Sequence, residues 1–267
     1  MKRHAAYSTA KALLRPLPPL RGLLPLALGL AAWQLAQGEE RVSAYFPPPS
    51  AWWKGMDQLA ASGRLVKASL ATLETILLGL ILAAMFGAFI GVLVGVSPRA
   101  RRALGPLLEF CRAMPPPAIV PLAILFLGYD ERMKLTIVAL SAMWPVLLNT
   151  TAAVERIHPV LLDVSVSFHL TTLDCVRRVI FPSAIPAILL GVKVSLPLTI
   201  VLTLLVEILT SIDGVGALMI AAQRNYQSAQ VYGLLAYVGF FGFLLNIAFS
   251  LIDATIMRRW PPRNQRT

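Results

Sequence analysis

Six long apolar segments alternate with short polar ones along the chain. A helix needs about 20 mostly apolar residues to cross the hydrocarbon core of a bilayer; five segments meet this length, and the first is shorter and contains a proline. The pattern predicts an all-α fold, a polytopic membrane protein with six transmembrane helices. The approximate bounds are Leu20–Gln37, Leu70–Val96, Ala103–Leu127, Leu135–Ala153, Ile185–Leu209 and Val231–Met257.

The second of these spans carries a stripe of small residues. Gly79, Gly87, Gly91 and Gly95 recur at spacings of four and eight. This spacing places them on one helix face, where small residues let another helix approach closely in lipid. We therefore expect this face to pack tightly against a neighbouring span.

Composition supports a membrane protein. Of the 267 residues, 57% are apolar and only 14% are charged, and the mean hydropathy is +0.70; soluble domains carry about 25% charged residues. The net charge of +11 is spread in patches between the apolar runs, which argues against a soluble enzyme and against nucleic acid as a partner. Cys111 and Cys175 have no spacing typical of a disulfide framework or a metal site.

The lysines and arginines of the loops predict the orientation. Fifteen lie in the two terminal stretches and in the loops after the second and fourth spans, against seven in the other loops. Because cytoplasmic loops carry the excess of these residues, both termini and the loop 154–184 are predicted to be cytoplasmic. The predicted parts are a cytoplasmic N-terminus with the first transmembrane helix (1–40), an extracytoplasmic segment (41–69), a five-helix core (70–257) and a cytoplasmic tail (258–267).

The loop 154–184 is long enough to hold structure of its own. One short helix is predicted to begin near Pro159, a favourable residue for a first helical turn. A second is predicted to have Thr171 as its N-cap with Asp174 three residues on, the spacing of a capping box, and to end at Pro182. Such capped helices suit docking on a partner, but the pattern fits a plain connector equally well.

At this loop the chain resembles the permease subunit of a bacterial binding-protein-dependent ABC importer of the nitrate/sulfonate/taurine branch. That family carries a cytoplasmic signature of E-A-A, a glycine four residues later, and a terminal I-x-L-P. Asp163, Val164 and Ser165 take the first three positions, His169 takes the glycine position, and Ile180–Pro182 matches the end. Other similar stretches, among them FPPPSAWW, WPVLLNT and VEILTSIDGVGALM, extend the resemblance over about 40–260.

The resemblance implies a type I importer fold and a place in the bacterial inner membrane. It implies three protein partners: an ATP-binding cassette ATPase, an extracytoplasmic solute-binding protein and a second permease chain, expected to be identical. The chain has no G-x-x-x-x-G-K-[ST] loop, so it is expected to be no enzyme and to need no cofactor, with ATP hydrolysed in the ATPase. The expected solute is small and polar, of which nitrate, sulfonates and taurine are examples.

The same resemblance carries over a set of residues expected to couple the permease to the ATPase. They are Asp163, Val164, Ser165, His169, Thr171, Asp174, Arg177 and Pro182. His169 departs most from the signature, because a glycine at this position allows a turn with positive φ. Histidine is among the residues tolerated in that region, so we expect the turn to persist with strain.

Three residues within the spans are candidates for the pathway or for gating. Glu207 is an ionisable group deep in the fifth span or in its outer third, which marks a functional candidate; a gating or subunit-contact role and a structural hydrogen bond are both open. Pro116 belongs to a run of three prolines that removes helix donors, and this predicts either a pathway-lining kink or a bend near the cytoplasmic interface. Asn149 is expected to hydrogen-bond between helices.

Two other functions are weighed against the importer. A secondary transporter needs several buried acids and an internal repeat, and the sequence has one deep carboxylate and no evident repeat. A non-transporting membrane scaffold is favoured only by the altered signature at Val164, Ser165 and His169. An intramembrane enzyme is disfavoured because the HExxH and GxSxG motifs are absent.

Overall fold

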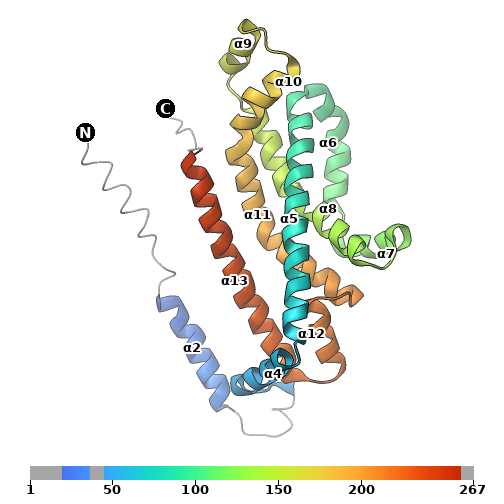
Figure 1. The fold of residues 1–267 in the computed structure, drawn as a ribbon, viewed down its shortest axis with the longest axis vertical. Helices are drawn as coiled ribbons and strands as arrows, with labels where there is room; N and C mark the ends of the chain where they lie inside the picture. The colour runs from blue at the N-terminus through green and yellow to red at the C-terminus, as the bar shows by residue number, and fades with distance from the viewer. Residues whose placement is uncertain (1–19, 37–44, 260–267) are drawn as a thin grey trace, which may run out of the picture.

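The computed structural model describes residues 20–36 and 45–259, and every regular element in these ranges is helical (Figure 1). Long helices run side by side, with α9 and α10 at one end of the molecule and α4 at the other. The elements are α2 (Leu20–Leu35), α4 (Pro49–Ala61), α5 (Arg64–Val96), α6 (Pro98–Ala113), α7 (Pro116–Leu127), α8 (Glu131–Glu155), α9 (Pro159–Ser167), α10 (Thr172–Cys175), a π-helical turn η1 (Val176–Ile180), α11 (Phe181–Thr210), α12 (Val215–Arg224) and α13 (Ser228–Arg259).

The predicted all-α membrane architecture is confirmed. Within the described residues, four helical segments are long and apolar enough to cross a membrane: Arg64–Val96, Glu131–Glu155, Thr172–Thr210 and Ser228–Ile256. The third predicted span is a pair of helices, α6 and α7, bent by 97° at the predicted proline run. The described apolar part of α2, Leu24–Leu35, is shorter than a span.

The glycine stripe of α5 packs against α8, as predicted. A Cβ added at Gly87 would lie 2.7 Å from the Met143 carbonyl oxygen, and one at Gly91 would lie 2.7 Å from Thr150 Cβ. On the other side of α8, the Ser195 hydroxyl of α11 donates to the Ala142 carbonyl at 2.7 Å. Helix α8 is thus the centre of a three-helix core with α5 and α11.

The prediction that Pro182 ends the second short helix is wrong. Helix α10 passes through η1 directly into α11, and Pro182 lies in the first turn of α11. A proline lacks the N–H that continues the helix ladder and crowds the preceding turn. The wider π turn absorbs this defect, with the Phe181 N–H bonded to the Val176 carbonyl, and one helical run of 39 residues extends over Thr172–Thr210.

Three aromatic rings fasten α2 at the α4 end of the molecule. The ring of Trp33 meets Trp52 edge-on at a centroid distance of 5.1 Å and Tyr232 at 5.4 Å, and Trp52 and Tyr232 stack at 5.6 Å. Beside them, the Ser50 N–H donates to the Gln34 side-chain oxygen at 3.1 Å. Tryptophan and tyrosine favour the membrane–water interface, which agrees with an interfacial end for this helix.

Candidate functional site

The turn between α9 and α10 has the backbone predicted for the signature's glycine. His169 has a φ of +52°. Its N–H donates to the Val166 carbonyl at 2.9 Å, and the Leu170 N–H donates to the Ser165 carbonyl at 3.0 Å. These two bonds form a Schellman motif, in which glycine is preferred at the position that His169 occupies. The left-handed turn therefore persists with a residue that strains it.

The predicted cap of the next helix is confirmed. Thr171 Oγ1 accepts from the Asp174 N–H at 3.2 Å and donates to the Asp174 carboxylate at 2.7 Å. The other carboxylate oxygen of Asp174 lies 3.4 Å from Arg178 Nε. Thr171 and Asp174 both stabilise the start of this helix, so a substitution at either residue acts first on the position of the helix.

The eight predicted coupling residues divide into an outer and an inner set. Ser165 is buried: its hydroxyl donates to the Leu162 carbonyl at 2.6 Å and lies 3.4 Å from Cys175 Sγ, which joins α9 to α10. Asp174 and Pro182 are half-buried. The remaining members are exposed: Asp163, Val164, His169, Thr171 and Arg177.

Two apolar side chains beside this turn were missed by the sequence analysis. Phe168 is 76% exposed and Leu173 is 77% exposed, one on each side of His169. Exposed apolar surface away from membrane-facing helices is typical of a protein–protein contact. The sequence alone did not single them out, because Leu161, Val166 and Leu170 of the same loop are apolar too.

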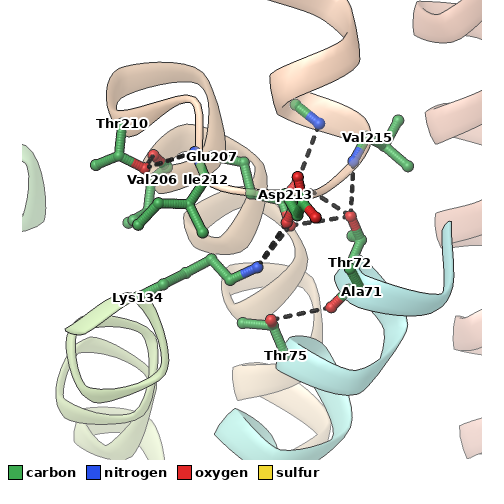
Figure 2. A network of polar contacts seen from close by, with 11 residues as sticks. Ala71, Thr72, Thr75, Lys134, Val206, Glu207, Thr210, Ile212, Asp213 and Val215 are labelled. Carbon is green, nitrogen blue, oxygen red and sulfur yellow. Dashed lines mark hydrogen bonds and ion pairs between the residues drawn. The ribbon is translucent and has the colours of Figure 1, made fainter. Parts of the chain in front are cut away.

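A second candidate site surrounds Glu207, near the end of α11 (Figure 2). Its carboxylate is fully buried and accepts hydrogen bonds from the Thr72 hydroxyl of α5 at 2.9 and 3.0 Å. The Gly216 N–H, in the first turn of α12, donates to the same carboxylate at 3.0 Å. Lys134 Nζ of α8 lies 3.5 Å from Glu207 Oε1. A buried charge needs such partners, and here three other helices, α5, α8 and α12, supply them.

The turn between α11 and α12 is bound into the same network. Lys134 Nζ donates to the Asp213 carbonyl at 2.8 Å, and the Val215 N–H donates to Thr72 Oγ1 at 2.9 Å. A Cβ at Gly214 would overlap the Glu207 carboxylate. Any side chain at Gly214 would therefore displace the acid. The network is closed and well paired, as expected for a structural clamp.

The fourth span was predicted to begin at about Leu135, which places Lys134 in the loop before it, but the helix begins earlier. Helix α8 begins at Glu131, capped by the Asp130 side chain, which accepts from the Met133 N–H at 3.0 Å. Lys134 consequently lies in the first turn, and its side chain is only 1% exposed. The aspartate before E-R-M-K is the cap signal that would have moved the start of this helix forward.

The other two pathway candidates lie apart from Glu207 and from each other. Pro116 is the first residue of α7, directly after the bend. The Asn149 amide donates to the Pro145 carbonyl of its own helix at 2.8 Å, and a role of this residue between helices stays a prediction. The structure thus does not bring Glu207, Pro116 and Asn149 into one site. No cluster of three or more metal-ligating side chains occurs among the residues that the structure describes.

Comparison with known families identifies the chain. Residues 75–260 match the family described as "Binding-protein-dependent transport system inner membrane component". The chain belongs to this family. It is therefore the membrane-embedded permease component of a transport system, and the inner membrane of bacteria is where such permeases lie.

Similar proteins and solved structures agree with this assignment. The permease is 30% identical to the permease protein assigned to aliphatic sulfonates transport in Bacillus subtilis, over 90% of this chain and 87% of the relative. It is also 30% identical to a bicarbonate transport system permease of Synechocystis, over 90% and 88%. A permease chain of a methionine ABC transporter, solved in inward-facing conformations, superimposes with a TM-score of 0.62 at 18% identity and covers 74% of this chain and 98% of its own length. This confirms the type I importer fold.

Proposed function

We propose that this permease forms the pathway of an ATP-driven importer and is coupled to a separate ATPase through the turn between α9 and α10. The observation that carries this proposal is the pair of exposed apolar side chains, Phe168 and Leu173, which flank the strained turn at His169. Asp163, in the adjoining α9, and Arg177, in the adjoining η1, add exposed charges to the same segment. An apolar centre with a charged rim is the usual anatomy of a protein interface.

The capped helix start gives this surface a fixed shape. The Thr171–Asp174 cap and the buried Ser165–Cys175 contact hold α10 against α9. Val164 extends the exposed apolar surface on α9. Pro182 follows the π turn that joins α10 to α11, so a partner bound at Leu173 acts directly on a membrane-spanning helix.

The orientation follows from the excess of basic residues in the predicted cytoplasmic loops. In this arrangement α9 and α10 face the cytoplasm and the ATPase, and α4 faces the solute-binding protein outside. A second, identical permease chain completes the pathway. The Glu207 network, at the α4 end of α11, then holds the outer ends of α5, α8 and α11 together. We assign it this structural role rather than a part in gating, because its side chains are almost completely buried.

The solute is proposed to be a small polar molecule that carries an oxyanion group. The relatives reported above are named for the transport of sulfonates and of bicarbonate, which share a small, charged, oxygen-rich group. Nitrate and taurine have the same chemistry. In this scheme the binding protein makes the main selection, and the permease passes the solute on.

The test is reconstitution of the permease with its ATPase and binding protein in vesicles. Phe168→Ser and Leu173→Ser are expected to abolish co-purification of the ATPase and to lower solute-stimulated ATP hydrolysis at least about tenfold, since interface anchors of this kind carry about 1.4 kcal/mol or more each. Ser167→Ala is the matched control: Ser167 is an exposed neighbour whose hydroxyl bonds only the Asp163 carbonyl of its own helix, at 2.9 Å. Normal ATPase binding by both serine variants would overturn the proposal and favour a scaffold.

A further inference from the structure

Helix α6 has a charged face that nothing in the described chain covers. None of its residues is buried, and its contacts are mainly with α5. Glu109 and Arg112 are exposed and form no hydrogen bond or ion pair with any described residue. Because they are three residues apart on a helix, they lie on the same face.

The opposite face of α6 is apolar. Leu107 and Phe110 each precede one of the two charged residues by two positions, which is about 200° around a helix of 3.6 residues per turn. They are 55% and 66% exposed. The helix therefore presents two free faces of opposite character, and only the apolar one suits lipid.

The charged face reaches membrane depth. Glu109 and Arg112 lie about 16 and 21 Å along the axis from Pro98, at 1.5 Å per residue. Helix α5, which α6 follows back from its end, is 33 residues or about 50 Å long. This length exceeds the roughly 30 Å hydrocarbon core by about 20 Å. With α5 extending about 10 Å beyond the core on each side, Glu109 and Arg112 both lie inside the core. Charges there avoid lipid and face water or protein.

The backbone at the end of α6 makes the same demand. The carbonyls of Arg112 and Ala113 would normally accept from the N–H groups four residues on, but those residues are Pro116 and Pro117. The chain turns by 97° here before α7. Irregular backbone with free carbonyls is tolerated at membrane depth only where water or another part of the protein supplies donors.

We infer that the Glu109–Arg112 face of α6, together with the α6–α7 bend, lines the water-filled solute pathway, and that Arg112 is the cation an oxyanion meets there. This inference rests on the proposed import function, and it adds which surface lines the pathway and which residue meets the oxyanion. A guanidinium offers a planar fork of donors that matches an oxyanion. Glu109 beside it keeps the site neutral overall, so that a bound anion is held weakly and passes on.

The rival explanation is an interface between two permease copies. Under two-fold symmetry, Glu109 of one copy would meet Arg112 of the other. Such a contact would exclude water from both side chains. Water access therefore separates the two explanations.

The test measures this access in vesicles that contain the assembled transporter. In a background with Cys111→Ala and Cys175→Ser, single cysteines replace Glu109 or Arg112, and Leu107→Cys and Phe110→Cys are the matched controls. Membrane-impermeant methanethiosulfonates, one bearing a sulfonate and one a trimethylammonium group, are applied from each side. We expect modification at 109 and 112 and none at 107 and 110. Protection at 109 and 112, or equal modification at all four positions, would overturn the inference.

The role of Arg112 is tested in the same preparation. At Glu109→Cys, the rate ratio of the anionic to the cationic reagent is expected to fall about tenfold when Arg112→Gln is added, because a nearby cation concentrates anions. An unchanged ratio would overturn the assignment of Arg112. ATP-driven uptake by the unaltered protein reports separately on the proposed function: uptake with no labelling in the cysteine variants rejects only this inference, and labelling without uptake by the unaltered protein rejects the import function.

Discussion

Lys134 and Glu207 lie 3.5 Å apart with side chains that are 1% and 0% exposed, although 73 residues separate them in the chain. Removal of one member leaves the other charge buried without its counter-ion, which costs about 3–5 kcal/mol in comparable pairs. We therefore expect Lys134→Met to lower the melting temperature of the purified permease strongly. The measurement is thermal unfolding in detergent.

Glu207→Gln is the companion variant. The amide keeps an acceptor for Thr72 and Gly216 while it removes the charge, so we expect a smaller loss of stability than with Lys134→Met. The rate of uptake per folded molecule distinguishes a structural role of the Glu207 network from a role in gating. We expect folded Glu207→Gln protein to transport at the normal rate, as a purely structural network requires. A changed rate at normal stability would contradict this structural role.

Gly214 is expected to tolerate no side chain. Gly214→Ala places a methyl group onto the Glu207 carboxylate, and overpacking of this kind costs about 1–3 kcal/mol. Gly239→Ala in α13 is the matched control, because a Cβ there has no atom within 4 Å. The thermal unfolding of the two variants is compared; equal stability would contradict the packing described around Gly214.

His169→Gly is expected to stabilise the turn between α9 and α10. A non-glycine residue in the left-handed region costs about 1–2 kcal/mol, and glycine removes most of this strain. Amide hydrogen exchange at positions 169 and 170, whose N–H groups form the two bonds of the turn, is expected to slow several-fold. His158→Gly is the control: His158 has a φ of −62° and its side chain caps α9, so its replacement by glycine is expected to speed the exchange. Faster exchange in both variants would show that His169 does not strain the turn.

Arg177→Glu is expected to uncouple ATP hydrolysis from uptake while membrane insertion stays normal. Arg177 is exposed on the turn that joins α10 to α11, so its reversal leaves the packing of the spans unchanged. A bulky insertion after Asp174 should have the same effect. Arg177→Lys, which keeps the charge, is the control. Normal uptake driven by ATP in the reversed variant would remove Arg177 from the contact with the ATPase.

Local sequence patterns predicted the features that depend only on neighbouring residues. The glycine spacing of α5, the Thr171–Asp174 cap and the left-handed turn at His169 each depend on a few consecutive residues, and each is confirmed. The apolar runs likewise predicted the long helices, because length and hydropathy decide whether a helix can span.

The missed features depend on partners far away in the chain. Thr72 and Glu207 are 135 residues apart, and no local pattern marks a threonine as the partner of a distant acid. Lys134 looked like a loop residue because charges usually end a span, yet here the opposite charge is supplied by another helix. Pro182 was expected to end a helix, and the π turn before it shows that a wider turn can accommodate the ring instead.

The unbroken helical run from Thr172 to Thr210 has a mechanical consequence. At 1.5 Å per residue its 39 residues form a rod about 58 Å long, with Leu173 near one tip and Glu207 near the other. Helix α8 contacts this helix near its middle, where Ser195 donates to the Ala142 carbonyl. A sideways displacement of the end at Leu173 would therefore move the end at Glu207 in the opposite direction. The π turn at Val176–Ile180 and the two prolines inside α11, Pro186 and Pro197, are the places where this helix bends most easily. Their stiffness would decide how much of the movement reaches the far side of the membrane.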